Sequence, residues 1–291
     1  MLTPMPTDPP HANASKRWEQ LAHLDKFSMD QKFKNDDFPK ISIVIPTYNS
    51  SQLIPLTLES VLGQNYPNYE VIIVDCSCDR TLESIKNYEN EKIQIFSIAN
   101  CKRYEMLNKG LTQASGEYIN FIFPGDYYIY SETLKYMMTM ALENNKPDLV
   151  YCGTLLREAK AEAKTLFREL SLDLLKKGQQ PTSLQSCWFK TDVVRALGKF
   201  NPTYNLRGGF DLMCRFELEG LKHFGIMRIL IDYDLRAITK TMITQHFLET
   251  MKALYRYFGL MTTVRWLFLQ KDTRRLMKSW MHSLKIAFLG R

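Results

Sequence analysis

The stretch ISIVIPTYN (41–49) decides the fold, because an apolar run ends abruptly in a turn-forming polar segment. A short run rich in β-branched residues is typical of a strand covered on both faces. A second run of this kind, VIIV (71–74), ends at Asp75, and residues 51–64 between the two runs carry apolar side chains at helical spacing. These residues predict a strand, a helix and a second strand.

The same alternation continues outward from this unit. Further strands are predicted at 93–98, 118–123 and 148–152, and further helices at 81–88, 104–114 and 131–144, with Ser131 as an N-cap. Regular alternation predicts an α/β fold with a doubly wound, mostly parallel sheet. Ligands of such sheets bind beyond the carboxyl ends of the strands, so the loops after Ile45, Val74 and Phe123 are expected to matter.

The second half of the chain is less regular. It predicts strands at 182–189 and 224–231, a helix at 210–220, and helices from about residue 242 with a break at Gly259. The expected organisation is an N-terminal arm with a short helix (1–38), a main domain (39–240) and a basic amphipathic helical tail (241–291). The main domain is expected to divide into two halves, 39–153 and 154–240.

Composition narrows the class of protein. The chain has 291 residues, 45% of them hydrophobic, and a net charge of +7. Residues 252–291 hold nine Lys and Arg and a single acid, so the excess charge belongs to the tail. Six scattered cysteines indicate a reducing compartment rather than a disulfide framework. Without a secretory signal or an apolar spanning run, the chain is expected to be cytoplasmic, or peripheral on the inner face of the membrane.

Two polar groups stand at the predicted strand tips. Pro46, Thr47, Tyr48 and Asn49 follow the first strand, where an aromatic ring can stack on a base and small polar groups can bind its edge; the alternative is a simple turn before a helix. Asp75 follows the second strand and can accept hydrogen bonds from a base or ribose, or can cap the next helix.

The order of these segments resembles the family 2 glycosyltransferases of GT-A fold. The resemblance rests on SIVIPTYN (42–49), LESVLGQNYPNYEVIIVD (58–75), RYEMLNKGLTQASGEYINF (103–121) and the pair Gly125–Asp126, and extends less closely over 182–220. It implies an enzyme that moves a sugar from a nucleotide sugar, often UDP-linked, in polysaccharide biosynthesis. The donor-binding residues that it implies are Pro46, Thr47, Tyr48, Asn49, Asp75, Arg103, Asn108, Lys109 and Asp126.

The metal region departs from the family pattern. Family members usually carry an Asp-x-Asp that holds Mn²⁺ or Mg²⁺, but Phe123 and Gly125 stand at the places of those two acids, and only Asp126 remains. A single carboxylate together with donor phosphates can still bind such a cation. Otherwise Arg103, Lys109 and Arg207 are the cations left to stabilise the leaving diphosphate.

The resemblance also implies that 39–153 is the nucleotide-sugar half of the main domain and that 154–240 is its acceptor half. Asp211 matches the catalytic acid of the family and would act as general base in an inverting displacement; the alternative is an acid that stabilises a helix N-terminus. Gln185 matches a polar contact to the acceptor. The implied acceptor is a glycan or a lipid-linked molecule.

The tail interleaves aromatic and aliphatic residues with Lys and Arg. Such a helix can lie in the interface of an anionic membrane, or it can pack on the core with its cations solvated. Nucleic-acid binding is not expected, because no recognised motif supports it. An alternative function is a catalytically degenerate relative that serves as a binding or scaffold protein at the membrane surface.

Overall fold

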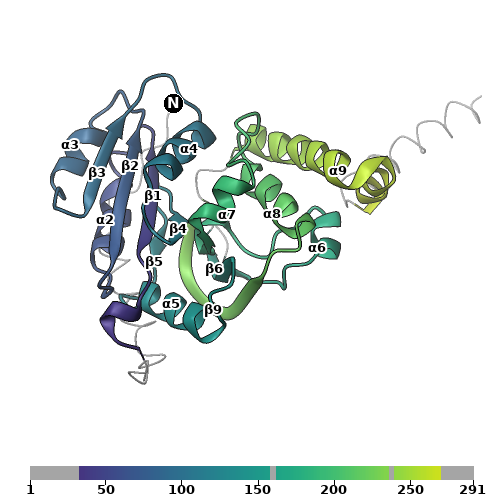
Figure 1. Cartoon of the computed structure of the whole chain (residues 1–291). Helices are drawn as coiled ribbons and strands as arrows, with labels where there is room; N and C mark the ends of the chain where they lie inside the picture. The colour runs from purple at the N-terminus through teal and green to yellow at the C-terminus, as the bar shows by residue number, and fades with distance from the viewer. Residues whose placement is uncertain (1–32, 158–161, 236–238, 270–291) are drawn as a thin grey trace, which may run out of the picture.

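The computed structural model describes residues 33–157, 162–235 and 239–269. A single mixed sheet runs through the described chain, with helices on both of its faces (Figure 1). The elements in chain order are η1 (Asn35–Asp37), β1 (Ile41–Thr47), α2 (Ile54–Leu62), β2 (Tyr69–Asp75), α3 (Thr81–Lys86), β3 (Ile93–Ser97), α4 (Arg103–Gln113), β4 (Tyr118–Phe121), β5 (Tyr127–Tyr128), α5 (Thr133–Glu143), β6 (Leu149–Arg157), β7 (Lys164–Leu166), α6 (Leu172–Lys176), η2 (Leu184–Ser186), β8 (Cys187–Lys190), α7 (Thr191–Ala196), α8 (Gly208–Leu218), β9 (His223–Asp234) and α9 (Lys240–Leu269).

The strand order is β3-β2-β1-β4-β8-β6-β9-β5, with β7 paired to β6. Strands β1 to β4 form a parallel block in which Thr47 is in register with Asp75, so the tips of β1 and β2 are neighbours. The antiparallel strand β8 joins this block to β6, and β6 runs parallel to β9 along its whole length. The predicted α/β sheet is confirmed, and its carboxyl edge lies where ligands of such sheets bind.

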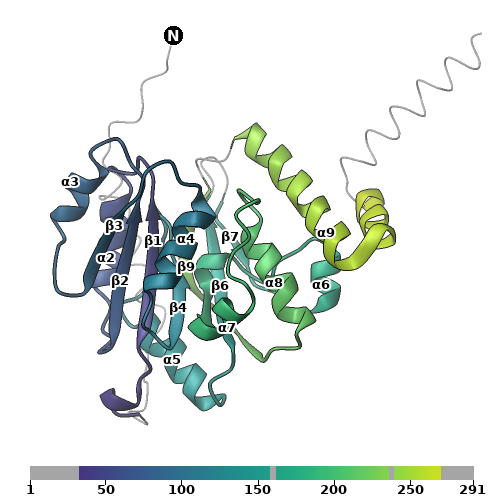
Figure 2. The same ribbon diagram turned by 45° about the horizontal axis from the view of Figure 1, so that its top comes forward.

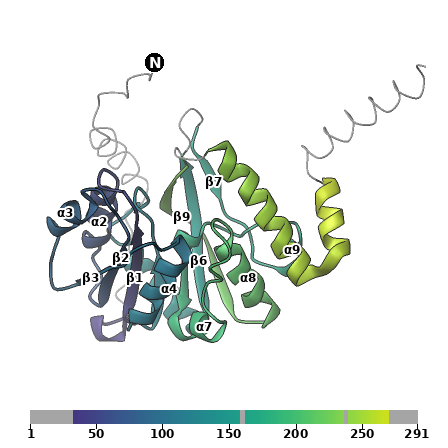
Figure 3. The same ribbon diagram turned by 90° about the horizontal axis from the view of Figure 1, so that it is seen from above.

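Two apolar cores flank the sheet because successive strand residues face opposite sides. Ile43 and Ile45 face a core that contains apolar residues of α2, α3 and α5. Val44 and Ile72 face the other core, which contains residues of α4, α6, α7, α8 and α9. Figures 2 and 3 show the two helical layers from other directions.

Helix α9 bends at Gly259, whose φ of 77° and ψ of 178° are open essentially to glycine alone. Ala253, Leu254 and Trp266 pack from α9 onto the core, and the Trp266 ring centroid lies 4.9 Å from that of Phe247. Among the described residues, no helix combines the length and hydropathy needed to cross a membrane. Most of the N-terminal arm (1–38), in which a short helix was expected, lies outside the described residues. The last part of the tail (270–291) lies wholly outside them.

Several details differ from the sequence-based expectations. Helix α5 begins at Thr133 with Glu132 as its N-cap, rather than with Ser131. The strand predicted at 224–231 extends to Asp234, which brings two further acids into the sheet. The short elements β5, β7, α6 and α7 were not expected, because runs of two to six residues carry too little periodicity to be recognised.

Candidate functional site

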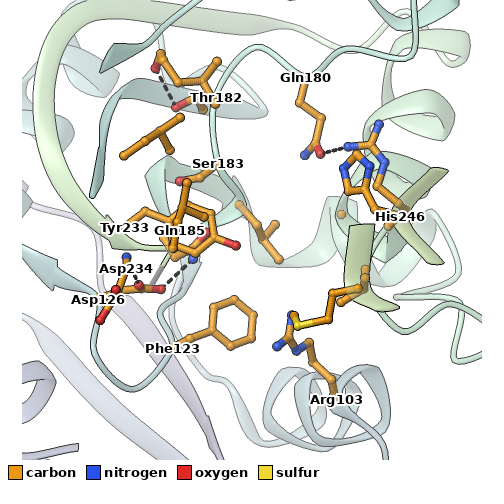
Figure 4. Close-up of a pocket in the computed structure, with 18 of the residues that line it drawn as sticks. Arg103, Phe123, Asp126, Gln180, Thr182, Ser183, Gln185, Tyr233, Asp234 and His246 are labelled. Carbon is orange, nitrogen blue, oxygen red and sulfur yellow. Dashed lines mark hydrogen bonds between the residues drawn. The ribbon is translucent and has the colours of Figure 1, made fainter. Parts of the chain in front are cut away.

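A pocket of about 660 Å³ opens beyond the carboxyl end of β4. Its walls come from the loop between β4 and β5, the start of α4, the segment 178–185, the start of α8, the end of β9 and the first turns of α9. Figure 4 shows Asp126, Asp234 and Gln185 grouped on one side of the pocket, with Gln180 and His246 on another. Residues from both predicted halves of the main domain therefore meet around one cavity.

Asp126 is buried at the base of this pocket, with 2% of its surface exposed. Its carboxylate accepts a hydrogen bond from Gln185 Nε2 at 2.6 Å and one from the backbone N–H of Asp234 at 2.9 Å. Burial raises the pKa of the Asp126 carboxyl to about 7. Small changes of pH around neutrality therefore decide whether the Asp126 carboxyl is protonated or charged.

The turn before Asp126 is fixed by its backbone. Gly125 has a φ of +95°, which side-chain-bearing residues rarely adopt, and its N–H donates to Thr57 Oγ1 at 2.9 Å. Thr57 Oγ1 in turn donates to the backbone oxygen of Asp126 at 2.8 Å. The position where the family pattern would place an acid is therefore occupied by a glycine that the turn itself favours.

A second carboxylate, that of Asp234, lines the pocket beside Asp126. Arg157 Nη1 lies 3.6 Å from Asp234 Oδ2, and Arg157 Nε donates to Asp232 Oδ1 at 2.9 Å. Asp234 was not among the site residues predicted from the sequence. The sequence IDYD (231–234) does carry a pattern that could have indicated Asp234, because acids alternate there with apolar residues at the end of a strand.

Arg103 and Gln185, which were predicted to contact donor and acceptor respectively, both line the pocket. Arg103 is exposed at the start of α4, and its guanidinium lies 4.9 Å from the centre of the Phe123 ring (Figure 4). Gln185 presents its amide to Asp126, so it connects the predicted acceptor half with the predicted donor half. Their roles toward donor and acceptor stay predictions.

The tips of β1 and β2 form a neighbouring polar group outside the pocket lining. Thr47 Oγ1 donates to Asp75 Oδ1 at 2.6 Å, and Ser77 Oγ donates to the same oxygen at 2.7 Å. Asn49 holds the two tips together, because its N–H donates to Ser77 Oγ and its Oδ1 accepts from the N–H of Cys78. The Tyr48 ring is 61% exposed, whereas Pro46 is buried in β1. An exposed ring beside an anchored carboxylate suits a nucleoside, and that role stays a prediction.

Asn108 and Lys109 do not line the pocket. The Asn108 amide exchanges two hydrogen bonds with the backbone of Phe200, at 2.8 and 2.9 Å, and so links α4 to the loop before α8. The Lys109 ammonium lies 5.5 Å from the centre of the Phe96 ring on β3. The structure therefore gives Asn108 a structural contact and leaves its contact with a donor as a prediction.

Asp211 is fully buried in α8 and is not part of the pocket lining. Its carboxylate accepts hydrogen bonds from Arg215 Nη2 at 2.8 Å and from Tyr257 Oη of α9 at 2.7 Å. The residue of α8 that lines the pocket is Gly209, which has no side chain to offer. The base role predicted for Asp211 has no support in these contacts, which are an ion pair within α8 and a hydrogen bond from α9.

Known structures share this arrangement of strands and helices. The crystal structure of Staphylococcus aureus TarS 1–349 in complex with UDP-GlcNAc aligns with a TM-score of 0.63 and 20% identity, over 75% of this chain and 66% of that chain. The mannosyltransferase PcManGT from Pyrobaculum calidifontis, in complex with GDP-Man and Mn²⁺, aligns with a TM-score of 0.58 and 16% identity, over 95% of this chain and 89% of that chain. The predicted GT-A type fold is confirmed.

Sequence relatives carry transferase names. The poly(ribitol-phosphate) β-N-acetylglucosaminyltransferase TarS of S. aureus strain Mu50 is 37% identical over 102 residues, which cover 33% of this chain and only 18% of TarS. A PGL/p-HBAD biosynthesis glycosyltransferase of Mycobacterium bovis strain BCG is 23% identical over 219 residues, covering 73% of this chain and 84% of the relative. The family model described as Glycosyl transferase family 2 matches residues 42–196, just over half of the chain. On this match, together with the fold, the chain belongs to glycosyl transferase family 2.

Proposed function

We propose that this protein transfers a sugar from a nucleotide sugar to a hydroxyl group of an acceptor. The observation that carries the proposal is the position of the pocket, which begins at the tip of β4 beside the polar tips of β1 and β2. Ligands of open α/β sheets bind at this edge. A volume of about 660 Å³ lies in the range of small-molecule sites and has room for sugar units.

The proposed donor is a UDP-sugar. Support comes from the TarS structure, which was solved with UDP-GlcNAc, and from the exposed Tyr48 ring beside the Asp75 carboxylate. The ring can stack on uracil, and the carboxylate can accept from the base or the ribose. Arg103, at the start of α4, would then face the diphosphate.

The pocket residues fit a divalent cation that shares its coordination with the donor. Among the described residues, no group of three or more His, Cys, Asp or Glu side chains is placed to hold a metal by itself. Asp126 and Asp234 offer two carboxylates at the pocket wall, and Mg²⁺ is commonly bound by one or two carboxylates plus substrate phosphates. Such an ion would neutralise charge on the leaving diphosphate, and Asp126 is the residue proposed to hold it.

The proposed reaction is a single displacement with inversion. The acceptor oxygen forms a bond to the anomeric carbon, the bond from that carbon to the diphosphate breaks, and a carboxylate takes the hydroxyl proton. Asp211 was the base expected from sequence, but Asp126 and Asp234 are the acids that line the pocket. We therefore propose Asp234 as the proton acceptor, and an Asp211 variant tests the sequence-based assignment.

The proposed acceptor is a glycan or lipid-linked molecule reached from a membrane surface. After its bend, α9 exposes Leu260, Met261, Val264 and Phe268 along one side, at spacings of one, three and four residues. An apolar helical face that is followed in the sequence by a basic segment (270–291) suits the interface of an anionic bilayer. The supporting observation is that the opposite side of the same helix packs on the core through Trp266.

A second candidate is a binding protein without turnover. It is favoured by one observation, that Phe123 and Gly125 stand where the two acids of the family's metal-binding pair were expected. Both candidates predict donor binding, and only the enzyme predicts slow release of UDP.

A thermal-shift screen of nucleotide sugars with and without Mn²⁺, followed by an assay for UDP release, tests the proposal. A ligand that binds only the native state raises the melting temperature. We expect a UDP-sugar to give the largest shift and UDP to accumulate over time. No shift with any nucleotide sugar contradicts the proposal, and a shift without UDP release favours the binding protein.

A further inference from the structure

The end of the pocket away from Asp126 is built around a buried arginine. Arg207 precedes α8, and its exposed fraction is 4%. Gln180 from the loop after α6 and His246 from α9 line the same end, and Figure 4 places them across the pocket from Asp126 and Asp234. The two ends of the cavity therefore differ in charge.

Among the residues that the structure describes, the groups that contact the Arg207 guanidinium are neutral. It donates to Gln180 Oε1 and, at 2.8 Å, to the backbone oxygen of Gly178, and it stacks at 4.0 Å on the Phe210 ring. Its Nε is buried without a hydrogen-bond partner. Burial lowers the Arg207 pKa to about 10, so the group is still charged at neutral pH.

The neighbouring acid does not neutralise this charge directly. Glu249 of α9 uses its two carboxylate oxygens to accept the backbone N–H groups of Asn205, Leu206 and Arg207, at 2.8 to 2.9 Å. No ion pair joins the Arg207 side chain to an acid within the described part of the chain. A buried cation without a paired anion lowers the free energy of unfolding. Such destabilising groups are commonly found at binding sites.

A second cation stands at the rim of the same end. Arg168 is exposed, lines the pocket and donates from Nη1 to the backbone oxygen of Gln180 at 3.0 Å. Gln180 is thus held through its side chain by Arg207 and through its backbone by Arg168. A group entering the pocket here meets one buried and one exposed guanidinium, the residues best suited to bind oxyanions.

We propose that this end of the pocket binds a phosphate-type anionic group of the acceptor, such as a phosphodiester, with Arg207 as its buried anchor. The inference rests on the proposed transferase function. The donor's own diphosphate is the other source of such an anion, but Arg207, Gln180 and His246 all come from chain segments after β6. The nucleoside is expected at the tips of β1 and β2, which are separated from β6 in the sheet by β4 and β8.

The test measures the binding of glycerol 3-phosphate and inorganic phosphate to the full chain by calorimetry, with saturating UDP present to occupy the donor site. We expect the wild type to bind both anions, and Arg207→Gln to bind them roughly tenfold more weakly or worse while it keeps its UDP affinity. Lys176→Gln, which removes an equal charge from an exposed residue of α6, is the matched control and should bind like the wild type.

Gln180→Glu keeps the test decisive if Arg207→Gln fails to fold. This substitution supplies the carboxylate that Arg207 lacks, so we expect a higher melting temperature of the free protein together with loss of anion binding. Wild-type anion affinity in Gln180→Glu overturns the proposal, as does an Arg207→Gln variant that loses UDP and keeps the anions. If no protein, the wild type included, binds UDP, the proposed transferase function is wrong. The anion titrations can then be repeated without UDP, and they still test the anion site.

Discussion

The carboxyl group of Asp126 titrates near neutral pH because it is buried beside Asp234 and Asp232. The folded chain keeps this proton up to a pH of about 7, whereas an unfolded aspartic acid loses it near pH 4. Between these pH values the native state binds more protons than the unfolded state. The contribution of the protonated Asp126 carboxyl to the free energy of unfolding is therefore complete below about pH 4 and is lost as the pH rises to about 7.

The Asp126→Asn variant removes this titration. We expect the melting temperature of the wild type, measured without metal, to fall relative to that of Asp126→Asn as the pH rises from about 4 to about 7. Melting profiles of the two proteins across this range, recorded by scanning calorimetry, provide the check. Parallel profiles contradict the raised pKa.

Asp211 and Asp234 are expected to respond differently to the same isosteric substitution. Asp211→Asn breaks a buried ion pair with Arg215 and should cost roughly 3 to 5 kcal/mol of unfolding free energy, since a charge is left unpaired. Asp234→Asn should lower turnover by at least about a hundredfold, as expected when a general base is removed, with a smaller effect on stability. Urea denaturation and UDP-release rates separate the two, and a stable, inactive Asp211→Asn restores Asp211 as the base.

At the residue scale, sequence patterns predicted some of the residues that line the pocket, but they did not predict how deeply other residues are buried or which side chains those residues contact. Arg103, Asp126 and Gln185 do line the pocket, and each was singled out by its match to the family pattern. The contact of Asp211 with Arg215, four residues later on one helical face, was visible in the sequence as a pair at helical spacing. The burial of Arg207 was not visible in the sequence, because it depends on segments distant in the chain.

Among the elements, α9 depends on the backbone of Gly259. An alanine there has room for its Cβ but must adopt a φ of 77° and a ψ of 178°. We expect Gly259→Ala to lower the unfolding free energy by about 1 to 3 kcal/mol, and Val264→Ala, an exposed site of the same helix, to have little effect. Chemical denaturation measures both, and equal stabilities would show that the bend is not required.

The exposed side of α9 gives a test of membrane contact. Met261→Glu places a charge in the middle of the apolar face, so we expect weaker cosedimentation with vesicles of phosphatidylglycerol and phosphatidylcholine. Met227→Glu is the matched control, because Met227 is as exposed, at 86% against 82% for Met261, but lies on β9. Equal loss of vesicle binding in both variants contradicts a specific role of α9.

Elements with long or strongly periodic patterns were predicted well. The apolar runs at 41–45 and 71–74 became β1 and β2, and the break expected at Gly259 is present. The three-residue β7 and the two-residue β5 depend on hydrogen bonds to β6 and β9 rather than on their own composition. Such tertiary pairing is beyond what a local pattern can predict.

At the scale of the whole molecule, the proposed donor site lies at the tips of β1 and β2, and the proposed acceptor site lies across the pocket toward α8 and α9. The alternation of strands and helices was enough to predict the sheet and its ligand-binding edge. The pocket could not be predicted in the same way, since β8 and β9 bring residues 178–185 and 232–234 beside the tip of β4 only in three dimensions.

Calorimetric titration of UDP-GlcNAc into the wild type and Asp75→Ala, with Asp79→Ala as the matched control, tests the placement of the donor most directly. Asp75 is anchored by Thr47 at the strand tip, whereas Asp79 lies beyond the tip and is hydrogen-bonded by Thr81 and by Ser51. The account predicts binding to the wild type and to Asp79→Ala, and none measurable to Asp75→Ala. Undiminished binding to Asp75→Ala would contradict it.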